Sequence, residues 1–386
     1  MGQYLTAPNN GSKSKDNQVD KELCRYKLER QRQHIPFNVE SWYPILKVQT
    51  FHTEFLSISP SIAQAFVNYY QARYNSKTVL FTHEHLNLIE SIENQLKNKL
   101  FHRPINEYFI RLSSRSPKDG DCLNQQLLKD IYDQELHRLK ENYPNEYDTI
   151  ESQSNMQMIA FCSAQFECLK VTNEREALNL ILSSERVFID LSDALQCEKL
   201  DDEKIPWNNH LILRQWHSQL NHSMEFRCFV YQSKLTAISQ YNHYCKFYHL
   251  QDQLIVQKIK LTIEKYFQDK IRMLFERCNE NYSNYIIDVG LMVNGSTNEF
   301  DCIVIELNPF DTSTGASLFN WTNDEELLTG KQNDVEIRVR GDYYPNIQDL
   351  IEFIHQENSL KTKNDRTDDH QPYFLFLDKM KNELSQ

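Results

Sequence analysis

Three oxygen-bearing side chains interrupt two apolar segments in the last third of this 386-residue chain. Asp288 lies in residues 285–293, and Glu306 and Asn308 lie in residues 301–308. A buried carboxylate is unfavourable unless a cation neutralises it, and magnesium prefers oxygen ligands that it shares with water and phosphate. These residue types predict a magnesium site for a bound nucleotide. The alternative is that Asp288 and Glu306 pair with Lys or Arg side chains of the chain itself.

The two segments are spaced for a β-hairpin. Residues 294–298 between them read Asn-Gly-Ser-Thr-Asn, and such residues favour tight turns. Side chains two residues apart share one face of a strand, so Glu306 and Asn308 are expected to point the same way. A turn centred near Thr297 places Asp288 opposite Glu306, and the three oxygen donors then converge on one face of the hairpin.

A phosphate-bearing ligand also needs cations, and residues 109–120 offer several of them. This segment is expected to be a strand that runs into a polar turn, with Arg111, Ser116, Lys118 and Asp119 in or beside the turn. Cationic side chains and backbone amides in such a turn bind anionic oxygens. The alternative interpretation is a solvated basic loop.

Two further arginines lie among apolar neighbours. Arg214 is in residues 211–216, and Arg227 is in residues 225–230. A guanidinium on a buried strand face requires an anionic partner, because an unpaired buried charge is strongly destabilising. That partner is Glu225, another carboxylate or a phosphate group, and the residue pattern leaves these possibilities open.

Strand patterns and helix patterns are mixed along the chain. Apolar residues recur at helical spacing in residues 83–100, 123–139 and 255–274. Extended segments are expected at residues 108–112, 187–190, 210–216, 225–231 and 234–240. The last two are joined by the short turn Gln232-Ser233 and should form a tight hairpin. This mixed order favours an α+β fold over a doubly wound parallel sheet.

The bulk composition excludes several classes of protein. A net charge of −12 gives no general attraction for nucleic acid, so no nucleic-acid partner is expected. Only eight glycines are present, which argues against a glycine-rich dinucleotide fold. No apolar run approaches the ~20 residues that span a bilayer, and the N-terminus has no apolar signal core. We therefore expect a cytoplasmic protein.

Both ends of the chain are polar. Residues 1–33 are expected to be a disordered tail, and residues 360–371 a loop before a last short helix. The initial sequence M-G-Q-Y-L-T fits the myristoylation pattern, with Gly2 as the modified residue. A single acyl chain at Gly2 would give only weak membrane association. The alternative is that Gly2 is unmodified.

Several separated motifs resemble one protein family. They are L-I-L-R-Q-W at 211–216, M-E-F-R-C-F-V at 224–230, K-L-T-A-I-S-Q-Y at 234–241, I-I-D-V-G at 286–290 and I-E-L-N-P-F at 305–310. In this order they resemble the cell division cycle protein 123 family, and the likeness runs from about Trp42 to Trp321. The resemblance implies an ATP-grasp-like fold, in which two α+β subdomains enclose a nucleotide cleft.

The resemblance also implies a division of the chain and a set of ligands. Residues 34–208 would be the N-terminal part of the ATP-grasp-like domain, residues 209–345 the C-terminal part that binds nucleotide and metal, and residues 346–386 a C-terminal helical extension. By resemblance the ligand is ATP with Mg2+, and the metal positions are Asp288, Glu306 and Asn308. The nucleotide-binding positions implied in the same way are Arg111, Ser116, Lys118, Asp119, Leu213, Arg214, Gln215, Trp216 and Arg227.

Members of that family act as chaperones that assemble eukaryotic translation initiation factor 2 by binding its gamma subunit, and the resemblance implies the same role here. One departure is Arg111, which stands where familiar members have a lysine, and the loop after it is more basic than usual. An arginine binds phosphate with a different reach and fork geometry. Two alternatives follow: an ATP-grasp ligase that activates a carboxylate as an acyl phosphate, and a scaffold whose nucleotide is structural.

Overall fold

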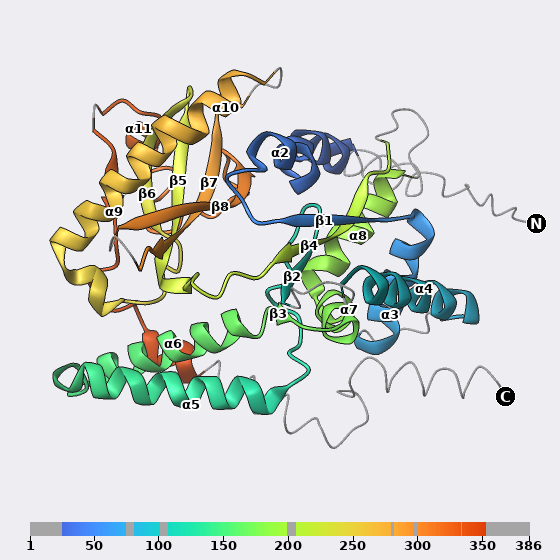
Figure 1. Cartoon of the computed structure of the whole chain (residues 1–386), viewed down its shortest axis with the longest axis horizontal. Coiled ribbons are helices and arrows are strands. Elements are labelled where there is room, and N and C mark those ends of the chain that lie inside the picture. The colour runs from blue at the N-terminus through green and yellow to red at the C-terminus, as the bar shows by residue number, and fades with distance from the viewer. Residues whose placement is uncertain are drawn as a thin grey trace, which may run out of the picture.

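The protein contains two β-sheets, each covered by helices (Figure 1). A computed structural model describes residues 25–74, 81–100, 107–198, 206–278, 282–295, 299–332 and 334–352. Within them the mixture of sheets and helices confirms the predicted α+β class. The relation to ATP-grasp proteins stays a prediction.

The first sheet has four strands in the order β1-β4-β2-β3, and all three pairs are antiparallel. Its strands are β1 (Thr53–Ile58), β2 (Tyr108–Leu112), β3 (Lys170–Val171) and β4 (Asn209–Gln215). The helices that pack on it are α3 (Pro60–Tyr74), α4 (His83–Leu100), α7 (Glu174–Ser183) and α8 (Glu185–Glu198). Apolar side chains of these helices and strands form one continuous core.

The second sheet has five strands in the order β8-β7-β5-β6-β9. Its strands are β5 (Glu225–Tyr231), β6 (Lys234–Gln240), β7 (Tyr285–Val293), β8 (Phe300–Pro309) and β9 (Glu336–Arg338). One face packs against α2 (Val39–Leu46) and against a nearly continuous helical rod made of α9 (Gln253–Tyr266), the π-helix Phe267–Ile271 and α10 (Arg272–Glu276). The other face is partly covered by aromatic residues around α11 (Glu325–Leu328).

Both predicted hairpins are confirmed. Strands β5 and β6 pair across Gln232 and Ser233, which have φ angles of 48° and 59°. Positive φ at both central residues is the geometry that matches the twist of a two-residue hairpin. Strands β7 and β8 pair in the expected register, because Asp288 lies opposite Glu306.

A helical hairpin made of α5 (Gln125–Asn142) and α6 (Ile150–Glu167) lies beneath both sheets in Figure 1. The Asn124 side chain accepts from the Leu127 amide and caps the start of α5, and Thr149 precedes α6 as part of a capping box. The side chain of Asn155 exchanges two hydrogen bonds with the backbone of Lys246, each 2.9 Å long. This exchange anchors α6 to the segment that follows β6.

The two sheets are joined directly at β8. Thr50, which precedes β1, forms an isolated bridge with Val304, and the Val304 amide donates to the Gln49 carbonyl over 2.8 Å. Arg214 of β4 donates to the Ile305 carbonyl and, over 2.6 Å, to the Thr50 hydroxyl. The edge strand of the second sheet is therefore hydrogen-bonded to the first sheet.

The expected strand at 187–190 is wrong, because these residues lie in helix α8. Val187, Leu191, Ala194 and Leu195 are the buried residues on its inner face, so the apolar spacing is helical once the whole segment is considered. The Ser184 hydroxyl accepts from the Val187 amide over 3.1 Å and caps the helix start. A four-residue window of β-branched and aromatic residues conceals this longer pattern.

The disordered tail predicted at 1–33 is wrong for its last part, because residues 25–34 are helical. Leu28 is buried there, and Lys27 forms a 2.6 Å ion pair with Asp193 of α8. These contacts give a polar segment enough burial and pairing to hold a helix. The remaining tail residues, Gly2 among them, lie outside the described part of the chain.

Residues 347–352 are helical. The rest of the C-terminal helical extension expected at 346–386 lies outside the described residues, so that extension stays a prediction. The loop predicted at 360–371 and the last helix lie outside the described residues. Among those that are described, no helix combines the length and the apolar character needed to cross a bilayer. The division of the chain at residue 208 stays a prediction, and the chain passes from the first sheet to the second after β4.

Candidate functional site

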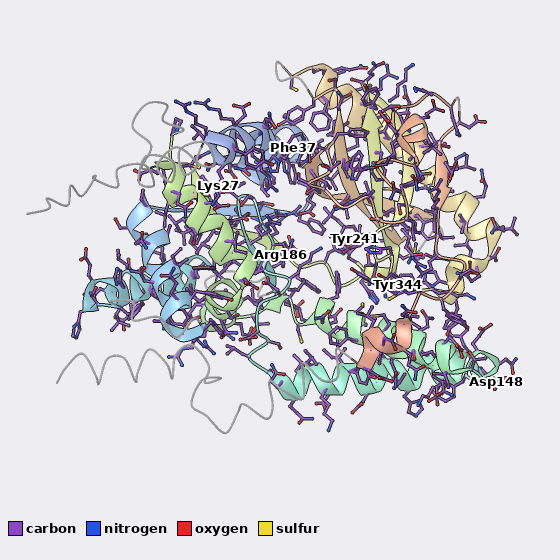
Figure 2. The ribbon with its side chains drawn as sticks, turned by 180° about the vertical axis from the view of Figure 1, so that it is seen from behind. Lys27, Phe37, Asp148, Arg186, Tyr241 and Tyr344 are labelled. Carbon is purple, nitrogen blue, oxygen red and sulfur yellow. The ribbon has the colours of Figure 1, made fainter. Side chains whose placement is uncertain are left out.

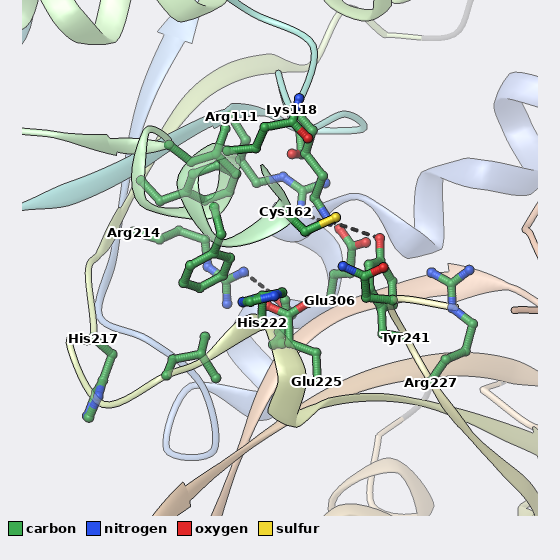
Figure 3. A pocket seen from close by; sticks show the side chains of 18 of the residues that line it. Arg111, Lys118, Cys162, Arg214, His217, His222, Glu225, Arg227, Tyr241 and Glu306 are labelled. Atoms are coloured by element: carbon green, nitrogen blue, oxygen red, sulfur yellow. Dashed lines mark hydrogen bonds and ion pairs between the residues drawn. The ribbon is translucent and has the colours of Figure 1, made fainter. Parts of the chain in front are cut away.

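A cavity of 520 Å³ opens between the first sheet, the second sheet and the end of α6 (Figure 3). Its volume is in the range of small-molecule and cofactor sites. Five cationic side chains and two carboxylates line it. The cations are Arg111, Lys118, Arg186, Arg214 and Arg227, and the carboxylates are Glu225 and Glu306. This excess of positive charge favours an anionic ligand.

The other part of the lining is aromatic. Phe166 of α6 is at the centre of it, with ring centroids 5.1 Å from Trp216 and 6.2 Å from His222. His222 is buried, and burial lowers its pKa to about 4, so the imidazole is neutral at physiological pH. Flat apolar rings of this kind stack on a heteroaromatic base.

One face of the second sheet supplies the acidic part of the site. The β-sheet register places Glu225 and Arg227 of β5 beside Gly290 and Asp288 of β7, and Asp288 beside Glu306 of β8. Alternating residues of a strand share a face, and Glu225, Arg227 and Glu306 line the cavity from this face. Asp288 and Asn308 are not among the residues that line it, and Asp288 is 1% exposed.

Arg227 and Asp288 form a buried bidentate ion pair. Arg227 Nε and Nη2 donate to the two Asp288 oxygens over 2.8 and 2.7 Å. Asn308 also donates to Asp288, over 3.2 Å, and the third Arg227 nitrogen, Nη1, donates to the Gly315 carbonyl over 2.6 Å. Burial raises the pKa of Asp288, and the Arg227 guanidinium opposes this shift. The sequence left open whether Arg227 pairs with a carboxylate or with a phosphate. In the structure it pairs with the Asp288 carboxylate.

Arg111 and Glu306 form a second pair, which crosses from the first sheet to the second. Arg111 Nη1 donates to Glu306 Oε2 over 2.7 Å, and Arg111 Nε donates to the Leu112 carbonyl. Burial tends to raise the pKa of Glu306, but Arg111 and Lys118 outweigh burial and hold it well below its usual range. The Glu306 carboxylate is therefore ionised at neutral pH.

Lys118 lies over Tyr241, a residue that the sequence did not single out. The ammonium donates to the Tyr241 hydroxyl over 2.9 Å and lies 4.5 Å from the ring centroid. Burial by itself lowers the pKa of Lys118, but Tyr241, Glu225 and Glu306 outweigh burial and raise it. Lys118 is thus a half-buried cation with ammonium hydrogens left for a ligand.

Two other residues of the cavity were also missed as ligand contacts. Glu225 is 8% exposed, burial raises its pKa to about 7, and no described residue donates a hydrogen bond to its carboxylate. Arg186 of α8 lines the cavity, and its guanidinium makes no hydrogen bond or ion pair with the part of the chain that the structure describes. In Figure 2 Arg186 and Tyr241 both lie near the centre of the molecule. Arg186 adjoins the segment misread as a strand, so its place in the fold could not be seen from the sequence.

The remaining predicted nucleotide residues divide into two groups. Ser116, Gln215 and Trp216 line the cavity, and the buried Ser116 hydroxyl has no hydrogen-bond partner among the residues that the structure describes. Leu213 instead packs in the core of the first sheet. Asp119 is bound by the Ser184 hydroxyl over 2.6 Å and by the Arg186 amide over 3.1 Å, so it caps α8.

Arg214 lines the cavity while its guanidinium bonds hold the two sheets together. It also lies over two aromatic rings, with Cζ 4.7 Å from the Phe51 centroid and 5.6 Å from the Trp42 centroid. Burial lowers the pKa of Arg214, and the neighbouring Arg111 lowers it further. An anion beside Arg111 and Arg214 would relieve this repulsion.

A family model described as D123 matches residues 159–377, which is more than half of the chain. Similar curated proteins are "Cell division cycle protein 123" of Phaeosphaeria nodorum, 32% identical over 163 residues, and "Translation initiation factor eIF2 assembly protein" of Danio rerio, 34% identical over 158 residues. The first alignment covers 41% of this chain and 38% of that protein, and the second covers 40% of each. The aligned region is thus less than half of each relative.

A solved structure supports the fold. The structure described as C-terminally truncated Cdc123 from Schizosaccharomyces pombe has a TM-score of 0.50 and 18% sequence identity, and the match covers 81% of this chain and 98% of that one. Identity this low shows that the two folds are similar and carries no argument about the ligands of the two proteins. From the match over residues 159–377 and the agreement of the curated relatives, the chain belongs to the D123 family, that of cell division cycle protein 123.

Proposed function

We propose that the cavity binds ATP together with magnesium and that this binding serves the assembly of eukaryotic translation initiation factor 2. The observation that carries the ligand is the lining, in which cations with unused donors adjoin a group of aromatic rings. Lys118, Arg186 and the free Nη2 of Arg111 would bind the phosphates. Phe166, Trp216 and His222 would hold the base.

The carboxylates suit magnesium only in the company of a polyphosphate. The structure describes no group of three or more His, Cys, Asp or Glu side chains that could hold a metal ion by itself. Asp288 and Glu306 are held by Arg227 and Arg111. Asp288 Oδ2 accepts hydrogen bonds from both Arg227 and Asn308, whereas Asp288 Oδ1 and Glu306 Oε2 accept one each and keep a lone pair. With Asn308 they fit an ion that takes its other oxygens from phosphate and water. When bound, the magnesium would neutralise phosphate charge.

Glu225 would act as an acceptor for the sugar. Its carboxylate has no hydrogen-bond donor among the described residues, and Figure 3 shows Glu225 between His222 and Tyr241. A ribose hydroxyl between the aromatic rings and the cations would supply the missing donor. This assignment would give a function to a carboxylate that lies among residues that otherwise favour anions.

The role in assembly is supported by the family. Relatives in Danio rerio and Dictyostelium discoideum are named translation initiation factor eIF2 assembly proteins, and this chain belongs to the same family. We extend that role to this chain, with the gamma subunit as the contact and an ATP-grasp-like cleft as the nucleotide site. The two sheets that border the cavity would be the counterparts of the two subdomains in that arrangement.

Calorimetry with ATP and magnesium tests the ligand. Wild-type protein should bind ATP, and Lys118→Met should weaken binding at least about tenfold, the scale of one charge-assisted hydrogen bond. Lys270→Met is the matched control, because Lys270 is an exposed lysine of the π-helix outside the cavity. Equal ATP affinity of wild type and Lys118→Met contradicts the site.

A pull-down from the native organism tests the role. Recovery of the gamma subunit with the wild-type chain is expected, and its absence contradicts the assembly role. Measuring ADP release with the same protein distinguishes the assembly role from the alternative function, that of an ATP-grasp ligase. ADP release that depends on an added amine acceptor would indicate a ligase that forms an acyl phosphate.

A further inference from the structure

Tyr241 lies between two cations of the cavity, Lys118 of the segment after β2 and Arg227 of β5. Its amide donates to the Glu225 carbonyl over 3.0 Å, which continues the β5–β6 pairing one residue beyond β6. This pairing puts the Tyr241 ring on the same sheet face as Glu225 and Arg227. Figure 3 shows the ring between Lys118 and Arg227, which come from opposite sides of the cavity.

Both cations contact the ring. Lys118 Nζ hydrogen-bonds the hydroxyl over 2.9 Å and lies 4.5 Å from the ring centroid, and Arg227 Cζ lies 4.9 Å from the same centroid. A tyrosine ring attracts cations at this distance through its quadrupole. One neutral side chain thus holds two like charges near each other, where they would otherwise repel.

The hydrogen bond of Lys118 goes to the neutral phenol even though two carboxylates are near. Glu225 and Glu306 both interact electrostatically with the ammonium, but neither accepts a hydrogen bond from it. A lysine–carboxylate pair would be a charge-assisted bond, which is stronger than a bond to a neutral hydroxyl. A phosphate oxygen therefore replaces a phenol more easily than it replaces a carboxylate.

We propose that Tyr241 is a positioning residue that keeps the Lys118 ammonium off Glu225 and Glu306 and ready for a phosphate group. This inference rests on the proposed ATP-binding function. It adds a role for Tyr241 in the phosphate-binding part of the site, because the ring and hydroxyl of Tyr241 contact the cations Lys118 and Arg227. Preorganisation of this kind raises affinity by lowering the cost of arranging the site.

The variant Tyr241→Phe tests the proposal, because it keeps the ring and removes only the hydroxyl. Without that acceptor Lys118 pairs with Glu225 or Glu306, and ATP must break an ion pair in order to bind. Calorimetry should show roughly tenfold weaker ATP binding by Tyr241→Phe, while adenosine binds as it does to wild type. The control is Tyr231→Phe, which removes a hydroxyl from β5 outside the cavity and should leave both affinities unchanged.

Two outcomes separate this proposal from the function on which it rests. If wild type does not bind ATP, the proposed function fails and the positioning role fails with it. If wild type binds ATP and Tyr241→Phe binds it equally well or more tightly, only the positioning role is overturned. Equal weakening for ATP and adenosine also overturns it, because that result indicates a general distortion of the cavity.

A double-mutant cycle with Lys118→Met checks that Tyr241 acts through the lysine. If it does, Tyr241→Phe weakens ATP binding in the wild-type background and has no further effect when Lys118 is already Met. Additive losses in the double variant contradict the proposal. Thermal unfolding of each variant, measured alongside, should show a folded protein, because the ring and its packing are retained in Tyr241→Phe.

Discussion

Arg111 on β2 donates a 2.7 Å hydrogen bond to Glu306 on β8, and this pair joins the first sheet to the second inside the cavity. The two side chains are 5% and 15% exposed, so the pair is largely shielded from water. A pair in this setting is stabilising only as long as both partners are present, because either one alone leaves a buried charge.

Replacing Arg111 should therefore destabilise the fold. Arg111→Met is expected to lower the free energy of unfolding by about 3 kcal/mol at pH 7, because Glu306 loses its hydrogen-bonded cation. Urea denaturation followed by fluorescence measures the change. Arg272→Met serves as control, since Arg272 pairs with Glu276 on an exposed helix face and should change stability by no more than about 1 kcal/mol. Similar losses in both variants would contradict the expectation.

Asp288→Asn separates the structural role of this carboxylate from its proposed role toward magnesium. The amide cannot neutralise Arg227, so stability should fall by about 2–4 kcal/mol, compared with little change in Glu276→Gln. In the still-folded variant, the gain in ATP affinity on adding magnesium should be smaller than in wild type. Equal magnesium-dependent affinities would remove Asp288 from the metal site.

The stability of the protein should depend on pH through Glu225. Burial raises its pKa from 4.5 to about 7 in the folded protein. A raised folded pKa stabilises the fold below pH 4.5, and this contribution is lost as the pH rises through 7. Between pH 4 and pH 8 wild type should lose about 3 kcal/mol relative to Glu225→Gln, which cannot ionise. A difference between the two proteins that stays constant over this range would contradict the buried carboxylate.

The loop that carries Lys118 depends on the absence of a side chain at Gly120. A Cβ atom there would lie 2.5 Å from the Leu180 carbonyl oxygen, so the loop must shift to accept one. Gly120→Ala should lower stability by about 1–3 kcal/mol and weaken ATP binding. Gly341→Ala is the matched control, because nothing lies within 4 Å of its added Cβ. Unchanged stability in Gly120→Ala would contradict this expectation, because the loop would then shift to accept the methyl group without destabilising the fold.

The sequence predicted well where the local signal was long or repeated. The two hairpins were expected from alternating apolar residues and turn formers, and Asp288 does face Glu306. The strand expected at 187–190 was wrong, because four residues are too few to distinguish a strand from one face of a helix. That error also concealed Arg186, which lies at the start of α8.

Parts of the site could not be predicted because they depend on contacts between distant segments. Lys118 and Tyr241 are 123 residues apart, and nothing local to Tyr241 indicates a lysine above it. Glu225 was considered only as a partner for Arg227, yet Arg227 turns to Asp288 on the neighbouring strand. Strand register decides such pairings, and register is a property of the assembled sheet.

The hydrogen bonds between β8 and the first sheet determine how a ligand would leave. Swinging one sheet away from the other would break the backbone bond of Val304 and the bonds of Arg214 together. The segment around Gly315 makes none of these bonds and is held by others, among them Arg227 to the Gly315 carbonyl, the Leu318 amide to Ser239 and the Trp321 indole to the Thr314 carbonyl. For the nucleotide proposed above, local opening of this segment would be a route of release that leaves the sheets joined, and substitutions there would change its residence time.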